Sequence, residues 1–250
     1  MSEIVTAAMV IIGDEILSGR TKDVNVGHLA DVMTAIGIDL KEVRIVGDDE
    51  NEIADAVNAV RTRYTYVFTT GGIGPTHDDI TADSVAKAFG LPCIYDEKAV
   101  AMLKASFSQR DMEVTEARMR MARMPEGATH IDNPISVAPG FVIGNVHVMA
   151  GVPAIFQAML DNVLPTLKTG TKLLTESVHC PFGEGTVGDA LAVVQKNNPA
   201  TIIGSYPKYF DGKFWTDIVV RARNEADLGK AVSAVKAMLE ETSARQASRN

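Results

Sequence analysis

The sequence has little cysteine and no long apolar run. Its two cysteines, Cys93 and Cys180, are too far apart for a metal-binding pair, which excludes a cysteine zinc site and a disulfide framework. No apolar stretch approaches the ~18 residues that span a bilayer. The first residues carry no basic flank before an apolar segment, so we expect no signal peptide and no membrane contact. These absences favour a reducing, cytoplasmic setting.

Basic residues are also scarce. Lys and Arg total 24 against 32 Asp and Glu, and the net charge is -8. This balance lacks the positive surface expected of a nucleic-acid-binding protein, so we expect no nucleic-acid partner. An acidic protein that binds phosphates usually does so through a cation or through backbone N–H groups. With 46% hydrophobic residues the composition is that of an ordinary globular protein.

Strand-like and helix-like patterns alternate along the first two thirds of the chain. A nearly continuous apolar run over 5–13 is typical of a strand buried on both faces of a parallel sheet. Helical spacing over 26–36, 53–60 and 82–89 is interleaved with strand-like sequence over 40–45 and 64–70. This order is the sequence form of βαβ units and predicts an α/β fold.

The later segments predict a second, smaller domain. One or two helices over 97–123 precede an irregular loop over 125–140, a hairpin over 141–149 and a helix over 152–167. A change of composition over 165–172 predicts a boundary between domains 1–170 and 171–250. The second domain should be α+β, with strands near Ser177, near Ile202 and over 215–220, helices over 185–196 and 225–239, and a frayed tail over 243–250.

A glycine-rich turn lies between a strand and a helix. It contains Gly71, Gly72, Gly74 and Pro75, followed by Thr76, Asp78, Asp79 and Thr81. Glycines let the backbone approach a ligand, and N–H groups at a helix start point at an anion. Two carboxylates beside a phosphate predict a bridging divalent cation such as Mg²⁺. The alternative is a tight turn in which Asp79 or Thr81 caps the helix.

The end of the first strand predicts the other half of the site. It carries Gly13, Asp14, Glu15, Ser18, Gly19, Arg20 and Asn25. In a parallel sheet this segment lies at the same carboxyl edge as the glycine turn. Its carboxylates complete a metal site, and Arg20 counters phosphate charge. The alternative is a loop that only caps a helix.

The loop before the hairpin predicts a place for a flat ring. It contains Asn133, Pro134, Ala138, Pro139, Gly140 and Phe141, whose backbone groups and aromatic ring could receive a base or a pterin. The alternative places Phe141 in the core. Gly151 and Pro153 begin a helix that offers further N–H groups. His77 is either a ligand contact or an exposed turn residue.

These motifs resemble the N-terminal domain of the competence/damage-inducible protein A (CinA) family, a branch of the molybdopterin-binding domains typified by MoaB and Mog. The resemblance rests on 13–25, 70–81, 123–127, Asn133 and Pro134, 138–141 and 151–153. It implies a three-layer αβα domain with a mostly parallel sheet that binds a pterin or nucleotide pyrophosphate at the carboxyl edge of the sheet. The small unit resembles the KH-like middle domain of that family, without a GXXG clamp.

The motifs and the resemblance together leave three functional readings. The first is hydrolysis of a nucleotide diphosphate such as ADP-ribose or FAD, with Mg²⁺, Mn²⁺ or Co²⁺ held by Asp78, Asp79 and Asp14, and with Glu15 beside them. The second is molybdopterin binding or adenylylation, and the third is a non-catalytic scaffold. Related domains commonly form dimers or trimers, so we expect a homo-oligomer. The chain has no room for the deamidase domain of full CinA proteins, so we do not expect that activity.

Overall fold

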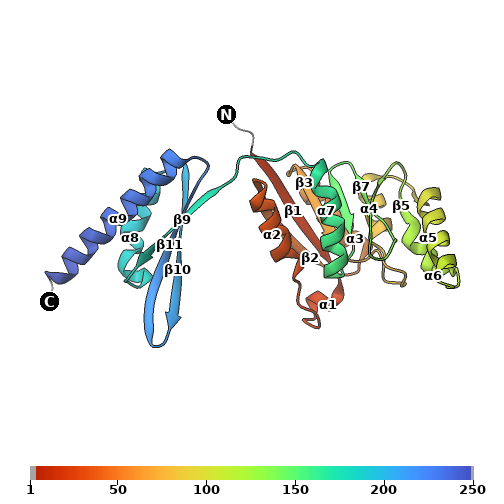
Figure 1. Cartoon of the computed structure of the whole chain (residues 1–250), viewed down its shortest axis with the longest axis horizontal. Coiled ribbons are helices and arrows are strands. Elements are labelled where there is room, and N and C mark those ends of the chain that lie inside the picture. Colours follow the sequence, from red (N-terminus) through yellow and green to blue (C-terminus); the bar gives the residue numbers. More distant parts are fainter. Residues whose placement is uncertain (1–3, 249–250) are drawn as a thin grey trace. The chain divides into compact units, whose positions relative to one another are not determined.

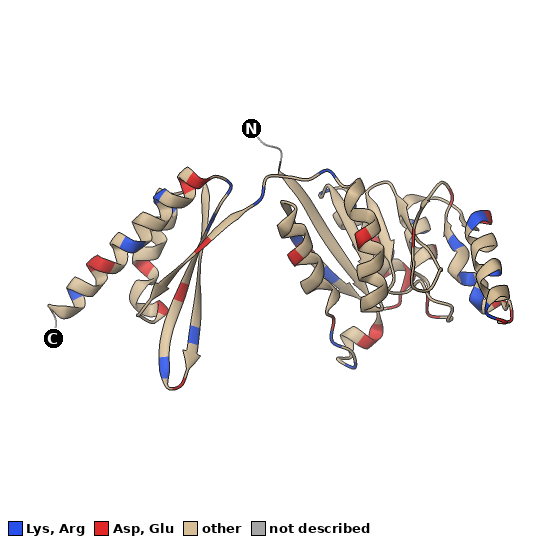
Figure 2. Cartoon of the chain, in the orientation of Figure 1, with Lys and Arg blue, Asp and Glu red and all other residues tan. Residues whose placement is uncertain are grey.

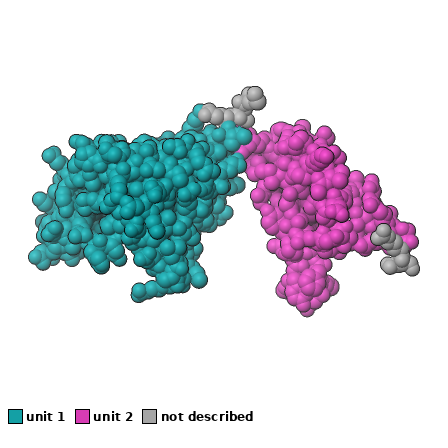
Figure 3. All heavy atoms as spheres, turned by 180° about the vertical axis from the view of Figure 1, so that it is seen from behind, with its two compact units in different colours: residues 1–170 teal, residues 171–250 magenta. Residues whose placement is uncertain are grey.

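A computed structural model of the chain describes residues 4–248. The chain divides into two compact units, Met1–Gly170 (unit 1) and Thr171–Asn250 (unit 2), which are coloured separately in Figure 3. None of the described helices is long and apolar enough to cross a membrane. Each unit has its own apolar core, and we describe the two units separately.

Unit 1 is built on a six-stranded sheet in the order β2-β1-β3-β8-β7-β6. The first four strands of that order are mutually parallel, and β7 and β6 join antiparallel. The prediction of a mostly parallel sheet is confirmed. The strands are β1 (Val5–Ile12), β2 (Ile38–Val46), β3 (Tyr66–Thr70), β6 (Thr129–Ile131), β7 (Gly140–Ile143) and β8 (Val146–Met149).

Helices cover both faces of this sheet, as Figure 1 shows. Strand β1 is buried on both sides because Ala7, Met9 and Ile11 enter one core while alternate residues enter the other. Helices α2 (Asn25–Ala35) and α7 (Pro153–Val163) pack on the first core, and α3 (Glu50–Arg61), α4 (Thr81–Phe89) and α5 (Glu97–Gln109) pack on the second. The three-layer αβα architecture is therefore confirmed.

Short elements connect these layers. The loop that we predicted over 125–140 contains strand β6, in which His130 pairs with Phe141 of β7, so the prediction of irregular structure was wrong there. Three residues are too few for a strand to show apolar alternation in the sequence. The other short elements are α1 (Asp14–Leu17), α6 (Glu116–Met119), β4 (Cys93–Tyr95), β5 (Arg123–Pro125) and the 3₁₀ turns η1 (Arg120–Ala122) and η2 (Leu164–Thr166).

Unit 2 packs two helices on one antiparallel sheet of order β10-β11-β9. Its elements are β9 (Leu174–Cys180), α8 (Glu184–Asn197), β10 (Thr201–Phe210), β11 (Lys213–Ala222) and α9 (Glu225–Ala247). Helix α9 runs into the predicted frayed tail, so that prediction was wrong over 243–247, while 249–250 lie outside the described residues. The buried Thr242 donates a hydrogen bond to the Met238 carbonyl at 2.8 Å and keeps the last turns packed.

Candidate functional site

Three strand ends meet at one edge of the sheet in unit 1, and glycines make that close approach possible. A Cβ atom on Gly71, after β3, would lie 2.1 Å from the Ile12 carbonyl oxygen at the end of β1. Gly71 also has φ +104°, which L side chains rarely adopt. On the other side, a Cβ on Gly151, after β8, would lie 3.3 Å from the Gly71 Cα atom. The backbone therefore forms the floor of the site.

The glycine turn is tied to the helix that follows it by Thr81. The fully buried Thr81 hydroxyl donates to the Gly71 carbonyl at 3.0 Å, and the Thr81 amide donates to the Gly72 carbonyl at 3.0 Å. A Cβ on Gly72 would lie 2.2 Å from the Thr81 hydroxyl oxygen. Thr81 is thus a structural anchor of the turn.

The amide groups of the turn are available to a ligand. Gly72, Ile73 and Gly74 lie outside any helix or strand, and their N–H groups donate no hydrogen bond to other residues within 4–248. Consecutive free amides in a turn with positive φ form a concavity that binds anions. Gly71 and Gly72 both have positive φ. The turn has the backbone geometry of a phosphate-binding loop.

Asp79 holds the second half of the turn in place. Its carboxylate accepts a hydrogen bond from the Thr76 amide at 2.8 Å and another from the Thr76 hydroxyl. A Cβ on Gly74 would lie 2.7 Å from the Asp79 Oδ2 atom, so the carboxylate lies directly over the turn. Asp78 is exposed, with its Oδ1 atom 3.9 Å from His77 Nδ1. Asp79 therefore holds the turn, and the carboxylate of Asp78 lies exposed beside it.

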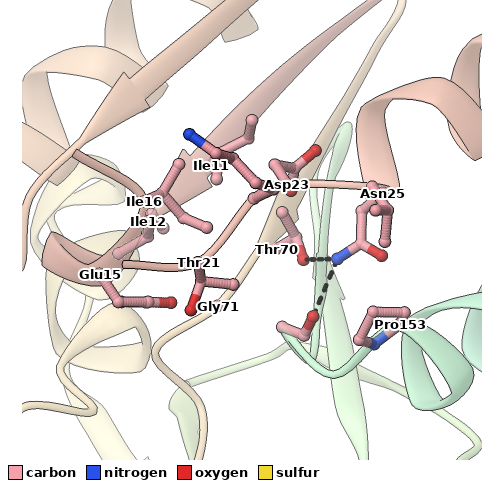
Figure 4. Close-up of a pocket in the computed structure, with 13 residues that line it drawn as sticks. Ile11, Ile12, Glu15, Ile16, Thr21, Asp23, Asn25, Thr70, Gly71 and Pro153 are labelled. Carbon is pink, nitrogen blue, oxygen red and sulfur yellow. Dashed lines mark hydrogen bonds between the residues drawn. The ribbon is translucent and has the colours of Figure 1, made fainter. Parts of the chain in front are cut away.

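Asn25 joins two of the strand ends, those of β3 and β8, as Figure 4 shows. Its buried side chain donates to the Thr70 hydroxyl at 2.9 Å and to the Gly151 carbonyl at 2.9 Å. The Thr70 hydroxyl in turn donates to the Ala150 carbonyl at 3.0 Å. The Asn25 Oδ1 atom is buried and has no hydrogen-bond partner among the described residues. A buried acceptor without a partner costs free energy, and a ligand donor would satisfy it.

These residues surround a hollow of about 510 Å³. Its walls are both polar and apolar, and the lining includes Glu15, Gly71, Gly72, Ile73, Gly74, Pro75, Asp79, Met121, Asn133, Ala138, Val152, Pro153 and Ile155. A narrow extension of about 60 Å³ leads to Asp23 and Asn25. The two spaces share Glu15, Thr21, Gly71, Gly151 and Pro153. This volume lies in the range of small-molecule sites.

Four carboxylates gather beside the hollow. The Asp14 amide donates to the Asp48 carboxylate at 3.0 Å. Burial raises the pKa of Asp48, and the negative charges of Asp14, Glu15 and Asp78 raise it further. Figure 2 shows acidic residues on α1 at this edge. Concentrated negative charge here favours a bound cation.

The carboxylates do not form a complete metal cage by themselves. Within residues 4–248, no group of three His, Cys, Asp or Glu side chains is arranged to hold a metal ion. Mg²⁺ commonly keeps several waters and takes one or two protein carboxylates together with substrate phosphates. The donor set at this edge fits such a cation: of the expected ligands, Asp14 and Asp78 would act with oxygen atoms of the ligand, whereas the Asp79 carboxylate is engaged by Thr76.

Several residues from the sequence prediction lie outside the lining of the hollow. Arg20, Ser18 and Gly19 are exposed near α1, and Pro134 is exposed in the loop before β7. Gly13 is buried beneath the site, where a Cβ would lie 2.4 Å from the Glu15 carboxylate. The sequence prediction did not distinguish residues that support the backbone at this edge of the sheet from residues that line the hollow.

The loop before β7 is organised by Asn133 and does not present an aromatic ring. Asn133 donates to the Ala138 carbonyl at 2.9 Å and accepts from the Ile135 and Ser136 amides. Phe141 is 2% exposed and lies in the core with the buried Gly140 and Pro139, so the expectation that it stacks on a ligand ring was wrong. The alternation of β7 turns Phe141 inward.

The structure adds Asp48, Thr21 and Ser136, which the sequence reasoning did not name. Asp48 follows β2, which lies next to β1 in the parallel sheet, so its position at the shared edge was a usable signal. Met121 lines the hollow although it comes from the segment after α6. Thr21, Asp23, Thr70 and Ser136 also line the two spaces. Only the tertiary structure brings these segments together.

The fold and this edge define a ligand-binding αβα domain of the MoaB/Mog type. Residues 8–169 match the family described as "Probable molybdopterin binding domain", and the chain belongs to that family. Residues 172–248 match the family described as "FAD synthase, middle domain".

Relatives agree with this assignment. The chain is 38% identical over 197 residues to a CinA-like protein of Desulfosudis oleivorans, covering 74% of this chain and 48% of that relative. It is 35% identical over 212 residues to a protein of Caldivirga maquilingensis, covering 81% of each. A solved structure of the protein CinA from Thermoplasma acidophilum matches 65% of this chain and 98% of that chain, with 33% identity and a TM-score of 0.61.

Proposed function

We propose that unit 1 hydrolyses the diphosphate bond of a nucleotide diphosphate-linked compound, such as ADP-ribose or FAD, with a divalent cation. The observation that carries this proposal is the pairing of free amides with carboxylates at one edge. The N–H groups of Gly72, Ile73 and Gly74 suit one phosphate, while Asp14 and Asp78 repel it unless a cation lies between them. A diphosphate with Mg²⁺ satisfies both sets of groups.

The hollow would bind the ring of such a substrate, and the acidic edge would bind its diphosphate through the cation. Apolar side chains of Ile73, Met121 and Ile155 receive a flat ring and exclude water from it. Asp14 and Asp78 would hold the cation, and Glu15 and Asp48 add negative charge nearby. A bound cation would supply charge stabilisation and would lower the pKa of a bound water. The turn amides then stabilise charge that develops on the leaving phosphate.

A second hollow next to the first is evidence for a substrate that has two parts joined by the diphosphate. It measures about 420 Å³, shares Pro75 with the first and is otherwise lined by Thr76, His77, Glu116, Ala117 and Arg120. Arg120 makes no ion pair with another described residue, so its guanidinium is free to contact a phosphate or ribose. Arg120→Gln should raise KM for ADP-ribose while leaving the affinity for AMP unchanged.

The test is hydrolysis of defined dinucleotides by the purified chain. ADP-ribose, FAD and NAD are incubated with Mg²⁺, Mn²⁺ or Co²⁺, and the products are separated by mass spectrometry. We expect AMP release that EDTA abolishes and that Asp78→Asn lowers at least tenfold. Asp161→Asn, at an exposed position of α7, is the matched control. Intact substrates under all three metals would contradict the proposal.

Molybdopterin binding, with or without adenylylation, is the second candidate. The unpartnered Asn25 Oδ1 atom favours it, because a pterin carries N–H donors that fit a buried acceptor at the narrow end of the hollow. Copurified pterin fluorescence, or adenylylation of added molybdopterin by ATP, would support this reading. Absence of both signals, together with dinucleotide cleavage, would leave hydrolysis as the function.

A non-catalytic scaffold is the third reading. It predicts that Asp78→Ala and Asp79→Ala leave all ligand binding unchanged. Because Asp79 holds the turn through Thr76, its variant needs a thermal unfolding control. A thermal shift screen with and without Mg²⁺ separates this reading from the first two, since a ligand that binds only the folded state raises the Tm.

A further inference from the structure

The tip of the β10–β11 hairpin in unit 2 exposes three aromatic side chains. Tyr209 is 63%, Phe210 74% and Phe214 72% exposed. The rings of Tyr209 and Phe214 stack across the hairpin with centroids 4.3 Å apart. The tip stands out as a narrow protrusion of unit 2 in Figure 3. Clustered exposed aromatic rings on a water-soluble surface mark an interaction site.

Two of the exposed rings, those of Phe214 and Tyr209, continue the buried face of the sheet, whereas Phe210 lies on the opposite face. Side chains alternate along β11, so Phe214 lies on the same face as Thr216, Ile218 and Val220. Those three side chains are buried, with Ile218 and Val220 in the core beneath α8 and α9. The hairpin extends beyond both helices, as Figure 1 shows, so Phe214 and its neighbour Tyr209 lack that cover. On the rest of this face the side chains are covered by helices, so a helix surface of a partner would suit Phe214 and Tyr209.

Unit 2 also presents an apolar groove between its two helices. The groove measures about 560 Å³ and is lined by Ala190, Val193, Val194, Ala234, Ala237 and Met238, with Asp189, Glu241 and Arg245 beside them. Val193 is 58% exposed. The groove therefore offers apolar surface on the side of the helices that no described residue covers.

The charges of the two surfaces are complementary. Lys208 and Lys213 flank the aromatic tip, outnumber the one carboxylate in its turn, Asp211, and form no ion pair with another described residue. The groove carries Asp189 and Glu241, of which Glu241 is 3.4 Å from Arg245. Asp189 remains unpaired within the described chain. Lysines on one surface and a free carboxylate on the other favour their association.

We propose that the hairpin tip of one copy binds the α8–α9 groove of a second copy, and that the contact is reciprocal. Both complementary surfaces belong to the same unit, so two copies can satisfy each other around a twofold axis. Three exposed aromatic side chains and their groove bury about 800 Å² per contact, and two contacts reach about 1,600 Å², the size of a stable interface. One contact alone is the size of a weak encounter.

The test is the mass of the full chain in solution. We expect a dimer by light scattering, with the dimer Kd raised at least tenfold by Phe210→Ser with Phe214→Ser and also by Val193→Asp. Ile202→Ser is the matched control, because Ile202 is 55% exposed on the same strand away from the tip. A monomeric wild-type chain, or a dimer that survives all of these changes, would overturn the proposal.

A charge exchange tests which surfaces meet. Lys213→Glu should weaken the dimer, and Asp189→Lys in the same chain should restore it because the attraction returns with opposite signs. A mixture of Phe214→Cys and Val193→Cys chains, distinguished by a tag, should form a covalent heterodimer under oxidation. Additive weakening without restoration, or cross-linking only between identical chains, would contradict this pairing of surfaces.

Discussion

Glycines at the site of unit 1 and glycines in the helices of unit 2 have opposite surroundings. In unit 1, a Cβ on Gly71 would lie 2.1 Å from a backbone oxygen, and one on Gly72 would lie 2.2 Å from a buried hydroxyl. In unit 2, a Cβ on Gly188 of α8 or on Gly229 of α9 would meet nothing within 4 Å. The crowded glycines form the floor of the candidate site, whereas the open glycines only weaken helices. Glycines that have no room for a side chain therefore mark the places where two segments of the chain approach each other closely.

The strongest test of this comparison is Gly71→Ala. The new methyl group meets the Ile12 carbonyl and forces a left-handed conformation on alanine, so we expect unit 1 to lose about 3 kcal/mol or more. Urea unfolding followed by circular dichroism measures the change. Unit 2 should unfold as before, and an unchanged unit 1 transition would remove the crowding argument.

Two buried asparagine residues sharpen the comparison, Asn25 in unit 1 and Asn198 in unit 2. Asn25→Leu in unit 1 and Asn198→Leu in unit 2 both remove hydrogen bonds to backbone carbonyls, and each should cost about 1–3 kcal/mol. Only Asn25→Leu should also weaken ligand binding, at least tenfold by calorimetry, because Asn25 lines the narrow extension of the hollow and Asn198 does not. Equal effects of both variants on ligand affinity would show a general loss of structure instead.

The open glycines predict a gain. Gly188→Ala lies within α8 with free space around the added methyl group, so we expect unit 2 to gain about 0.5–1 kcal/mol from the lower backbone entropy of the unfolded chain. The midpoint of urea unfolding should rise for unit 2 alone. A loss of stability would contradict the prediction, because it would show that free space around the added methyl group is not enough for alanine to stabilise α8.

The smallest expected effect concerns Asp48. Because its pKa is raised in the folded state, the charged form opposes folding, and this cost appears as pH rises through the folded pKa. Asp48→Asn keeps an acceptor for the Asp14 amide and removes the charge, so its Tm should be higher than wild type at pH 7 and equal to it near pH 3. The same variant should bind Mg²⁺ with the ligand more weakly.

Asp161→Asn controls for the loss of one charge, because Asp161 is exposed on α7 away from the acidic edge. Its Tm should match wild type at both pH values. A Tm gain of equal size in both variants would point to net charge, not to the crowding of carboxylates at the site.

Much of the fold of unit 1 could be predicted from the sequence, because a strand buried on both faces of a parallel sheet is a long run of apolar residues. The run that became β1 and the helical spacing that became α2 and α3 both predicted the correct elements. The tip of the β10–β11 hairpin was not predicted, although Asp211 and Gly212 form a turn with positive φ at both positions, a pattern typical of tight hairpins. Polar and aromatic residues at the tip hide the alternation there.

The sequence by itself determined the glycine turn, its position after a strand and the carboxylates around it, because turn chemistry and strand endings are local properties. Tertiary structure decided where those residues lie and what they contact. Packing placed Phe141 in the core, Asp79 over Thr76 and Asn25 between two strand ends, and it brought Asp48 to the acidic edge. These assignments depend on contacts between segments far apart in the chain, which no local pattern encodes.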